Sequence, residues 1–151
     1  MQQIDSFTIR VYGLLINSKK QVLLVHEKLP DMQFTKFPGG GLEFYEGPEE
    51  CLIREFKEET DLDITIKEHI YTTGFFVQSA FKKNNQLLAI YYRVEPILND
   101  YLISYDEKEI TVNGKTEILR FFWADIDKLT TDILTFPVDK YVLENHLKNL
   151  V

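Results

Sequence analysis

The sequence has a single cysteine, Cys51, among its 151 residues. One cysteine excludes an internal disulfide framework and a cysteine-rich zinc site. Long apolar runs are also missing. Stretches such as residues 11–16 are far too short to span a bilayer, and the first ten residues contain no apolar run of the secretory type. We therefore expect a cytoplasmic protein that does not associate with membranes.

Positive charge is in short supply. Lys and Arg together number 17 against 24 Asp and Glu, which gives a formal net charge of −7 and a pI of about 5.0. This balance argues against a broad basic face for the phosphates of nucleic acid, so no stable nucleic-acid binding is expected. The excess of negative charge is concentrated in one segment, because residues 39–62 contain eight acidic residues and only two basic ones, Arg54 and Lys57.

The pattern of apolar residues predicts an α/β fold. The hydrophobic content of 44% is enough for a core, and no linker or repeat divides the chain, so residues 1–151 are expected to form one domain. A turn at 17–20 predicts that the first two strands pair as a hairpin, and helices are expected at 48–60 and 138–150. Strands are predicted at 7–16, 21–26, 63–78 (with a break near Lys67 and Glu68), 87–94 and 117–124. This order indicates a mixed sheet with helices packed on it.

The 48–60 helix gathers carboxylates on one side. At 100° per residue, Glu55, Glu58 and Glu59 share a narrow arc that borders the apolar stripe, while Arg54 and Lys57 lie off this arc. Like charges at these spacings repel one another. One interpretation is a solvated acidic face. The other is a set of hard oxygen ligands for Mg²⁺ or Mn²⁺.

A glycine-rich loop precedes this helix and favours the metal interpretation. Gly39, Gly40 and Gly41 are consecutive, and glycine allows backbone amides and carbonyls to approach an ion or a phosphate closely. We take Gly40 and Gly41 as substrate-binding candidates, together with Phe37, which could stack on a base, and Arg10, which could meet a phosphate. Core packing for Phe37 and an outward-facing strand position for Arg10 are the alternatives. Further aromatic candidates for stacking, each with core packing as the alternative, are Phe34, Phe75, Phe76 and Phe81.

These residues form a spaced pattern. Gly40 is followed after five residues by Glu46, after seven more by residues 54–60 with the sequence REFKEET, and then by Leu62. This pattern closely resembles the Nudix box, the signature of hydrolases that cleave nucleoside diphosphates linked to another moiety. The resemblance implies a Nudix-type α/β/α sandwich. The chain departs from the family pattern at Asp61, where the family usually has glycine, and a modest stability cost is expected there.

The resemblance also implies a metal site. Its ligands would be Glu55, Glu58 and Glu59 of the REXXEE segment, together with the backbone carbonyl of Gly39, and the cofactor would be Mg²⁺ or Mn²⁺. The spacing on the helix supports the same three carboxylates independently.

The implied mechanism is metal-assisted hydrolysis. We assign Glu55, Glu58 and Arg54 to the catalytic group, with Glu55 as the first choice for the general base. Arg54 would also pair with Glu46 and orient the loop against the helix. Glu117 is the candidate late-loop carboxylate, although this residue, Glu107 and Glu109 could each be an exposed loop acid. Cys51 is expected to be a small buried filler.

The expected function is hydrolysis of a phosphoanhydride bond by a Nudix pyrophosphohydrolase. The substrate would be a small nucleotide-type molecule, with a nucleoside triphosphate as the default. One alternative is a non-catalytic Nudix module that binds a nucleotide or sugar-nucleotide as a sensor, and another is a plain α/β interaction domain. A homodimer is a further expectation, since many small Nudix proteins dimerise.

Overall fold

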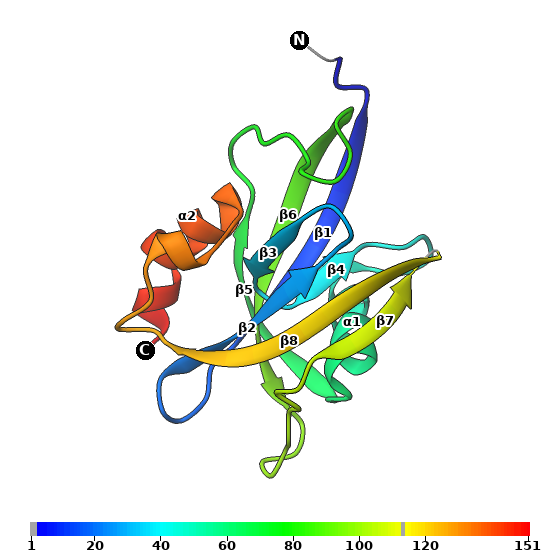
Figure 1. Ribbon diagram of the computed structural model, residues 1–151. Helices are drawn as coiled ribbons and strands as arrows, with labels where there is room; N and C mark the ends of the chain where they lie inside the picture. The colour runs from blue at the N-terminus through cyan, green and yellow to red at the C-terminus, as the bar shows by residue number, and fades with distance from the viewer. Residues whose placement is uncertain (1–2, 113) are drawn as a thin grey trace.

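Two four-stranded sheets form the centre of the molecule (Figure 1). The computed structural model describes residues 3–112 and 114–151. The first sheet has the order β4 (Gly39–Gly41), β1 (Ser6–Leu15), β6 (Asn85–Pro96) and β5 (Ile64–Thr72). The second has the order β3 (Gln33–Lys36), β2 (Gln21–Lys28), β8 (Lys115–Asp125) and β7 (Lys108–Val112). Strands β1 and β6 run parallel and their neighbours run antiparallel, so the first sheet is mixed, as expected.

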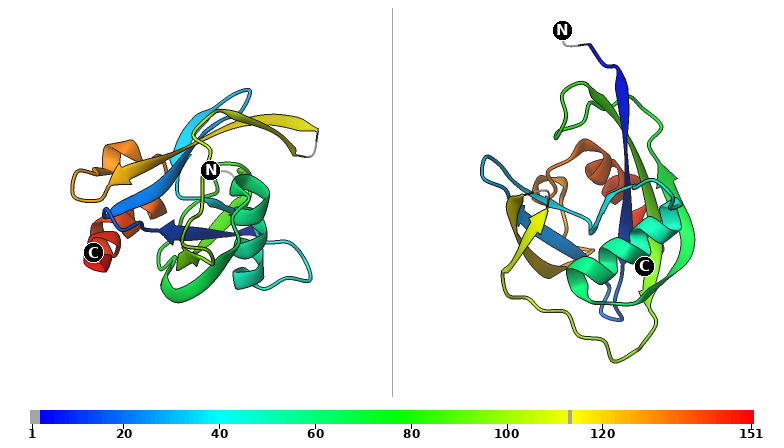
Figure 2. Two further views of the ribbon diagram at one scale, coloured as in Figure 1. Left: turned by 90° about the horizontal axis from the view of Figure 1, so that it is seen from below. Right: turned by 90° about the vertical axis from the view of Figure 1, so that its right-hand side faces the viewer.

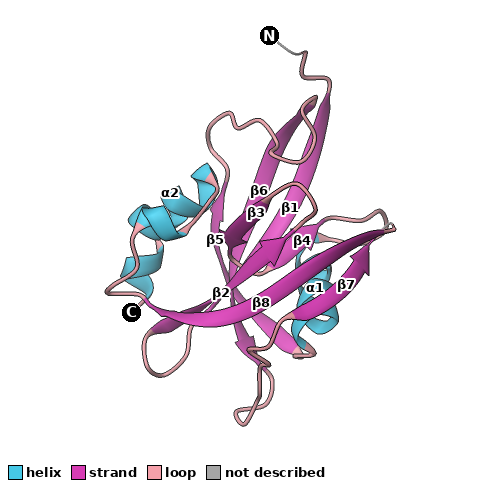
Figure 3. Cartoon of the chain, viewed as in Figure 1, coloured by secondary structure: helices cyan, strands magenta, loops and turns pink. Residues whose placement is uncertain are grey.

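Two helices flank the strands on opposite sides (Figures 2 and 3). They are α1 (Pro48–Thr60) and α2 (Pro137–Asn145), and two 3₁₀ segments, Thr131–Ile133 and Leu147–Leu150, lie on either side of α2 in the sequence. Successive side chains of a strand point to opposite faces. Val11 of β1 accordingly packs in the core beneath α1, and its neighbour Tyr12 packs in the core beneath α2. The α/β/α sandwich is therefore confirmed. None of the helices in the described residues is long and apolar enough to cross a membrane.

The expected hairpin between the first two strands is wrong. Strands β1 and β2 belong to different sheets, and an isolated bridge between Ile16 and Val22 links them. Strand β1 instead pairs along its whole length with β6, in a register that runs from Ser6 opposite Asn85 to Leu15 opposite Val94. A short connection favours pairing of consecutive strands. Here β6 pairs with one edge of β1 and β4 with the other, so no edge of β1 is left for β2.

Other boundaries differ from the prediction. Strand β5 ends at Thr72, well before residue 78. At the expected break near Lys67 and Glu68 the strand continues, but its register with β6 shifts between Ile66 and Glu68, and again between His69 and Tyr71. Strand β7 was not predicted, and its pairing with β8 gives it its extended form. The expected helix at 138–150 is α2 followed by a 3₁₀ segment, with a change of backbone conformation at His146.

Helix α1 has the predicted bounds, because its signals are local. Pro48 stands at the first helical position, where its missing N–H has no partner to lose. Glu50 Oε1 accepts a hydrogen bond from the Gly47 N–H at 3.0 Å and satisfies one free donor of the first turn. Leu52 and Phe56 are buried against the strands, so the helix is held by its apolar stripe.

Asp61 ends α1 in the left-handed conformation, with φ 61° and ψ 13°, and its N–H donates to the Lys57 carbonyl at 3.1 Å. Glycine adopts this conformation without steric cost. We expect Asp61→Gly to raise the melting temperature by about 1–2 °C and Asp61→Ala to lower it, as measured by thermal unfolding. The Asp61 side chain is 90% exposed, so losing its ion pair with Lys57 costs little. A lower melting temperature for Asp61→Gly would contradict this account.

Candidate active site

A cleft of about 260 Å³ lies where α1, the glycine strand β4 and the second sheet meet. It is acidic on several sides. Six carboxylates, two arginines, three glycines and four apolar residues line it: Glu27, Glu43, Glu55, Glu58, Glu59, Glu117, Arg10, Arg54, Gly39, Gly40, Gly41, Leu29, Phe34, Phe81 and Ile110. The structure thus brings together most of the residues that were selected from the sequence.

The carboxylate ridge, defined here as Glu55, Glu58 and Glu59, faces this cleft from α1. Glu55 is closely covered by the glycine strand, because a Cβ atom on Gly40 would lie 2.3 Å from the Glu55 carboxyl carbon. Gly39 has φ 152°, and a Cβ atom there would lie 2.0 Å from the Val11 carbonyl oxygen. Only glycine lets β4 pass this close to both the helix and β1.

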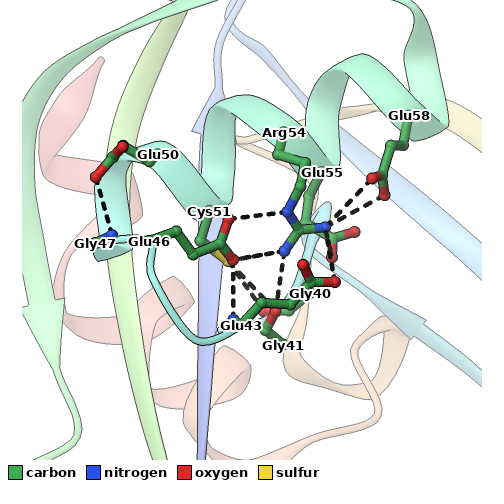
Figure 4. Close-up of polar contacts among 10 residues, drawn as sticks. All are labelled: Gly40, Gly41, Glu43, Glu46, Gly47, Glu50, Cys51, Arg54, Glu55 and Glu58. Atoms are coloured by element: carbon green, nitrogen blue, oxygen red, sulfur yellow. Dashed lines mark hydrogen bonds and ion pairs between the residues drawn. The ribbon is translucent and has the colours of Figure 1, made fainter.

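Arg54 ties the loop before α1 to the helix (Figure 4). Its Nε donates to Glu46 Oε2 at 2.9 Å and its Nη2 to Glu46 Oε1 at 2.7 Å, which is a bidentate pair. Nη2 also donates to the Gly41 carbonyl at 3.2 Å. The charge pair that the sequence suggested is therefore present, and it holds the glycine strand as well as the loop.

The same guanidinium also reaches the ridge. Nη1 donates to Glu55 Oε1 at 3.0 Å and to Glu58 Oε2 at 3.3 Å, and it lies 3.7 Å from Glu43 Oε1. Figure 4 shows these carboxylates converging on one end of Arg54. Hydrogen bonds from Arg54 lower the pKa of Glu46 to about 2, with burial opposing this effect.

A buried ion pair that the sequence analysis did not identify lies beneath the cleft. Lys36 Nζ lies 3.1 Å from Glu27 Oε1 and donates to the carbonyls of Phe37 and Gly39 at 3.3 Å. Burial alone would lower the pKa of Lys36, but the carboxylates of Glu27 and Glu59 raise it above its ordinary value. Side chains of a strand alternate between its two faces, so Glu27 of β2 shares a face with the buried residues Leu23 and Val25. This alternation could have predicted that Glu27 is buried.

Glu59 is the last carboxylate of the ridge along α1, and its residue is half-buried. Its Oε2 atom is buried and has no hydrogen-bond partner among residues 3–112 and 114–151. Burial raises the pKa of Glu59 to about 8, although Lys36 opposes this effect. An unpaired buried carboxyl oxygen is costly unless a proton or a cation satisfies it. This atom therefore fits a hard divalent cation. In the part of the chain that the structure describes, no three carboxylate, imidazole or thiol groups converge into a ready metal cage. Glu55 and Glu58 are instead in contact with Arg54.

The second sheet forms the opposite wall. Glu117 lies on β8 and lines the cleft, and burial raises its pKa, with Glu27 adding to the effect. Glu107 and Glu109 do not line the cleft. Glu107 pairs with Lys28 at 3.2 Å, and Glu109 is an exposed residue of β7 rather than a loop residue.

The expected substrate contacts divide into two groups. Arg10 lines the cleft, where its Nε donates to the Tyr12 hydroxyl at 2.7 Å and its guanidinium lies 5.1 Å from the Phe81 ring centroid. Phe37 does not line the cleft, because its side chain is completely buried in the core beneath α2 and packs edge-on against Tyr91. Phe34 and Phe81 line the cleft instead.

The remaining candidates lie elsewhere. Phe75 and Phe76 are exposed and do not line the cleft. Cys51 is buried, with its thiol facing the Gly41 carbonyl at 3.5 Å, and burial raises its pKa to about 12. A protonated, enclosed thiol of this kind is a packing residue rather than a nucleophile.

The two-sheet sandwich and its acidic, glycine-walled cleft define a protein of the Nudix fold. A model of the NUDIX domain matches residues 6–145, and the chain therefore belongs to the Nudix hydrolase family. Enzymes of this family act on pyrophosphate bonds and generally use divalent metal ions.

Solved structures share this fold at low sequence identity. A NUDIX hydrolase from Nitrosomonas europaea is 19% identical with a TM-score of 0.69, and the match covers 95% of this chain and 90% of that one. A MutT protein from Methanosarcina mazei Go1 is 17% identical with a TM-score of 0.68, covering 99% and 97%. The ORF135 protein of E. coli is 15% identical with a TM-score of 0.66, covering 97% and 92%.

The Glu46 pKa predicts a pH dependence of stability. Its folded value of about 2 lies below the ordinary value of 4.5, so the stabilisation is complete above about pH 4.5 and is lost as the pH falls toward 2. We expect Glu46→Gln to lower the melting temperature at pH 7, and the difference from wild type to shrink below pH 4.5. The control is Glu49→Gln, which removes an exposed carboxylate close to Glu46 in the sequence, in the first turn of α1. A difference that stayed constant down to pH 2 would contradict the assignment.

Proposed function

We propose that this protein is a Mg²⁺- or Mn²⁺-dependent hydrolase that cleaves a phosphoanhydride bond of a nucleoside diphosphate-linked substrate, with a nucleoside triphosphate as the default. The observation that carries the proposal is the buried, unpartnered Oε2 of Glu59, which lies in a cleft shared with Glu55 and Glu58. Six carboxylates line the cleft against two arginines, so added positive charge would favour the entry of an anionic substrate. Membership of the Nudix hydrolase family supports the same reaction class.

The residues that would hold the cation are Glu55, Glu58 and Glu59 and the carbonyl oxygen of Gly39. Hard oxygen ligands of this kind suit Mg²⁺ and Mn²⁺. When bound, the cation would neutralise the diphosphate and lower the pKa of an attacking water.

Glu55 is the proposed general base. It is only 14% exposed, and its carboxylate lies closely against Gly40, so its orientation is restricted. Its carboxylate would accept the proton of the attacking water. Glu117 is the rival base, since it faces the ridge from the opposite sheet and burial raises its pKa.

Arg10 and the glycine backbone are the proposed substrate contacts. Within the described residues Arg10 forms no ion pair, although its guanidinium lines the cleft. A guanidinium in this position can bind a phosphate in a bidentate manner. Gly41 leaves room for a phosphate, since a Cβ atom there would have only Arg10 Nη1 within 4 Å, whereas Gly40 lies against the Glu55 carboxylate and would offer its backbone alone. Phe81 adds an aromatic surface near Arg10.

The first activity test uses Glu58→Gln. This change removes one charge from the ridge at an exposed position, with the side chain 57% exposed, so the fold should persist. We expect release of phosphate or pyrophosphate from a nucleotide panel to require Mg²⁺ or Mn²⁺ and to fall about 100-fold or more in the variant, which is about 3 kcal/mol of barrier. Glu49→Gln is the matched control and should retain full turnover.

The outcomes of this test separate the alternatives. Equal turnover in Glu58→Gln and in excess chelator would overturn the metal assignment. Tight nucleotide binding without turnover, across the whole panel and with both metals, would favour the sensor function instead.

The second activity test uses Arg10→Gln. Loss of a phosphate contact made in both ground and transition states should raise KM about 10-fold or more with a smaller change in kcat. Tyr12→Phe is the control, because it removes the hydroxyl that accepts from Arg10 and keeps the guanidinium and the ring packing. An unchanged KM in Arg10→Gln would remove Arg10 from the substrate contacts.

A further inference from the structure

The Arg54 guanidinium has two ends with different surroundings. The edge formed by Nε and Nη2 is held by both oxygens of Glu46, at 2.9 and 2.7 Å, and by the Gly41 carbonyl. The Nη1 end lies among the carboxylates of Glu43, Glu55 and Glu58 (Figure 4). One end is therefore anchored to the loop, and the other is directed at the carboxylate ridge.

At the Nη1 end a single nitrogen is shared among three carboxylates, and its shortest contact is the 3.0 Å hydrogen bond to Glu55 Oε1, whose side chain is 14% exposed. Nη1 lies 3.3 and 3.5 Å from the two oxygens of Glu58 and 3.7 Å from Glu43, and both of those side chains are more than half exposed. Glu46 is only 13% exposed, and its contacts are shorter. Exposed, long ion pairs contribute little free energy, whereas a bidentate, enclosed pair contributes more. The contacts with Glu43 and Glu58 can therefore exchange at little cost. The Glu55 contact can exchange without loss of the Glu46 anchor, because Nε and Nη2, and not Nη1, make that anchor.

Glu59 differs from the other two ridge carboxylates because Arg54 does not contact it. The ion pairs of Arg54 involve Glu43, Glu46, Glu55 and Glu58. A cation that approached the ridge would find Glu59 Oε2 without a partner, but would meet the guanidinium at Glu55 and Glu58.

We propose that Arg54 is the resident counter-ion of the carboxylate ridge, and that a divalent cation takes over Glu55 and Glu58 from Nη1 while the Nε–Nη2 edge stays on Glu46. This inference rests on the cation site proposed above. It makes Arg54 a positioning residue that holds the repelling carboxylates together at low cation concentration. Because the guanidinium and the cation share oxygens, Arg54 also lowers cation affinity by competition.

The first test compares Arg54→Gln with wild type in thermal unfolding, with EDTA and with saturating Mg²⁺. In EDTA the variant leaves Glu55 and Glu58 without their contact to Arg54, so its melting temperature should fall by about 3–6 °C. The rise caused by Mg²⁺ should be about twofold larger in the variant than in wild type, since the competitor has gone. Lys57→Gln is the charge-matched control, because Lys57 pairs with Asp61 and Asp63 away from the ridge. Its Mg²⁺-induced rise should match that of wild type.

Glu46→Gln tests the opposite side of the same pair. Without its anchor the guanidinium is free to bind the ridge with both nitrogens, so the Mg²⁺-induced rise should be smaller than in wild type. A merely structural ion pair predicts the same Mg²⁺-induced rise in Arg54→Gln, Glu46→Gln and wild type. That result would overturn the proposal.

Arginine side-chain NMR of the wild-type protein gives a direct measurement that does not need a folded variant. On titration with Mg²⁺, the Nη1 signal of Arg54 should shift while the Nε–H signal keeps its position. Equal shifts of the Nη1 and Nε–H signals would overturn the proposal that the cation replaces Nη1 alone. The proposal would also be overturned if neither signal shifted while Mg²⁺ raised the melting temperature. Absence of any Mg²⁺ effect on wild type would instead refute the cation site of the proposed function, which separates the two failures.

Discussion

Carboxylates crowded on one face of a helix repel one another, and the repulsion grows as water is excluded. The carboxylate ridge of α1 borders the buried stripe of the helix, so this repulsion has to be balanced by nearby positive charge. Arg54 reduces the repulsion through its ion pairs with Glu55 and Glu58, and its ion pair with Glu46 of the preceding loop holds it in place. Lys36 balances the repulsion from below, through Glu27 and its field at Glu59. The loop, the glycine strand and the cleft are all held by contacts with one of these two cations.

The two-sheet architecture places these groups. The chain leaves the second sheet at Lys36 and enters the first at Gly39, so the connection crosses the middle of the molecule beneath the cleft. Lys36 donates to two carbonyls of this crossing and thereby fixes it. Helix α1 then covers the edge of β4, while Glu117 faces the ridge from β8. A cleft with acids on both walls results from strands that are distant in sequence.

Local signals predicted the elements better than their pairing. Helix α1 matched its predicted bounds because a proline, a capping glutamate and an apolar stripe all lie within thirteen residues. The hairpin between the first two strands was wrong because a short turn says nothing about the competing partner β6, which follows much later in the chain. Strand β7 was missed for a similar reason, since its form depends on pairing with β8.

The sequence by itself determined the carboxylate ridge, because helical periodicity places its three glutamates on one side of α1, and the resemblance to the Nudix box implied the Arg54–Glu46 pair. The glycine-rich segment was expected as a loop, and its pairing with β1 makes it strand β4. Tertiary structure alone decided that Arg10, Glu27 and Glu117 share the cleft with the ridge and that Phe37 lies in the core. Those positions depend on which strands pair and which face each strand turns inward. Such pairings join residues far apart in the chain, and the free energy that selects them comes from the whole core rather than from any one segment.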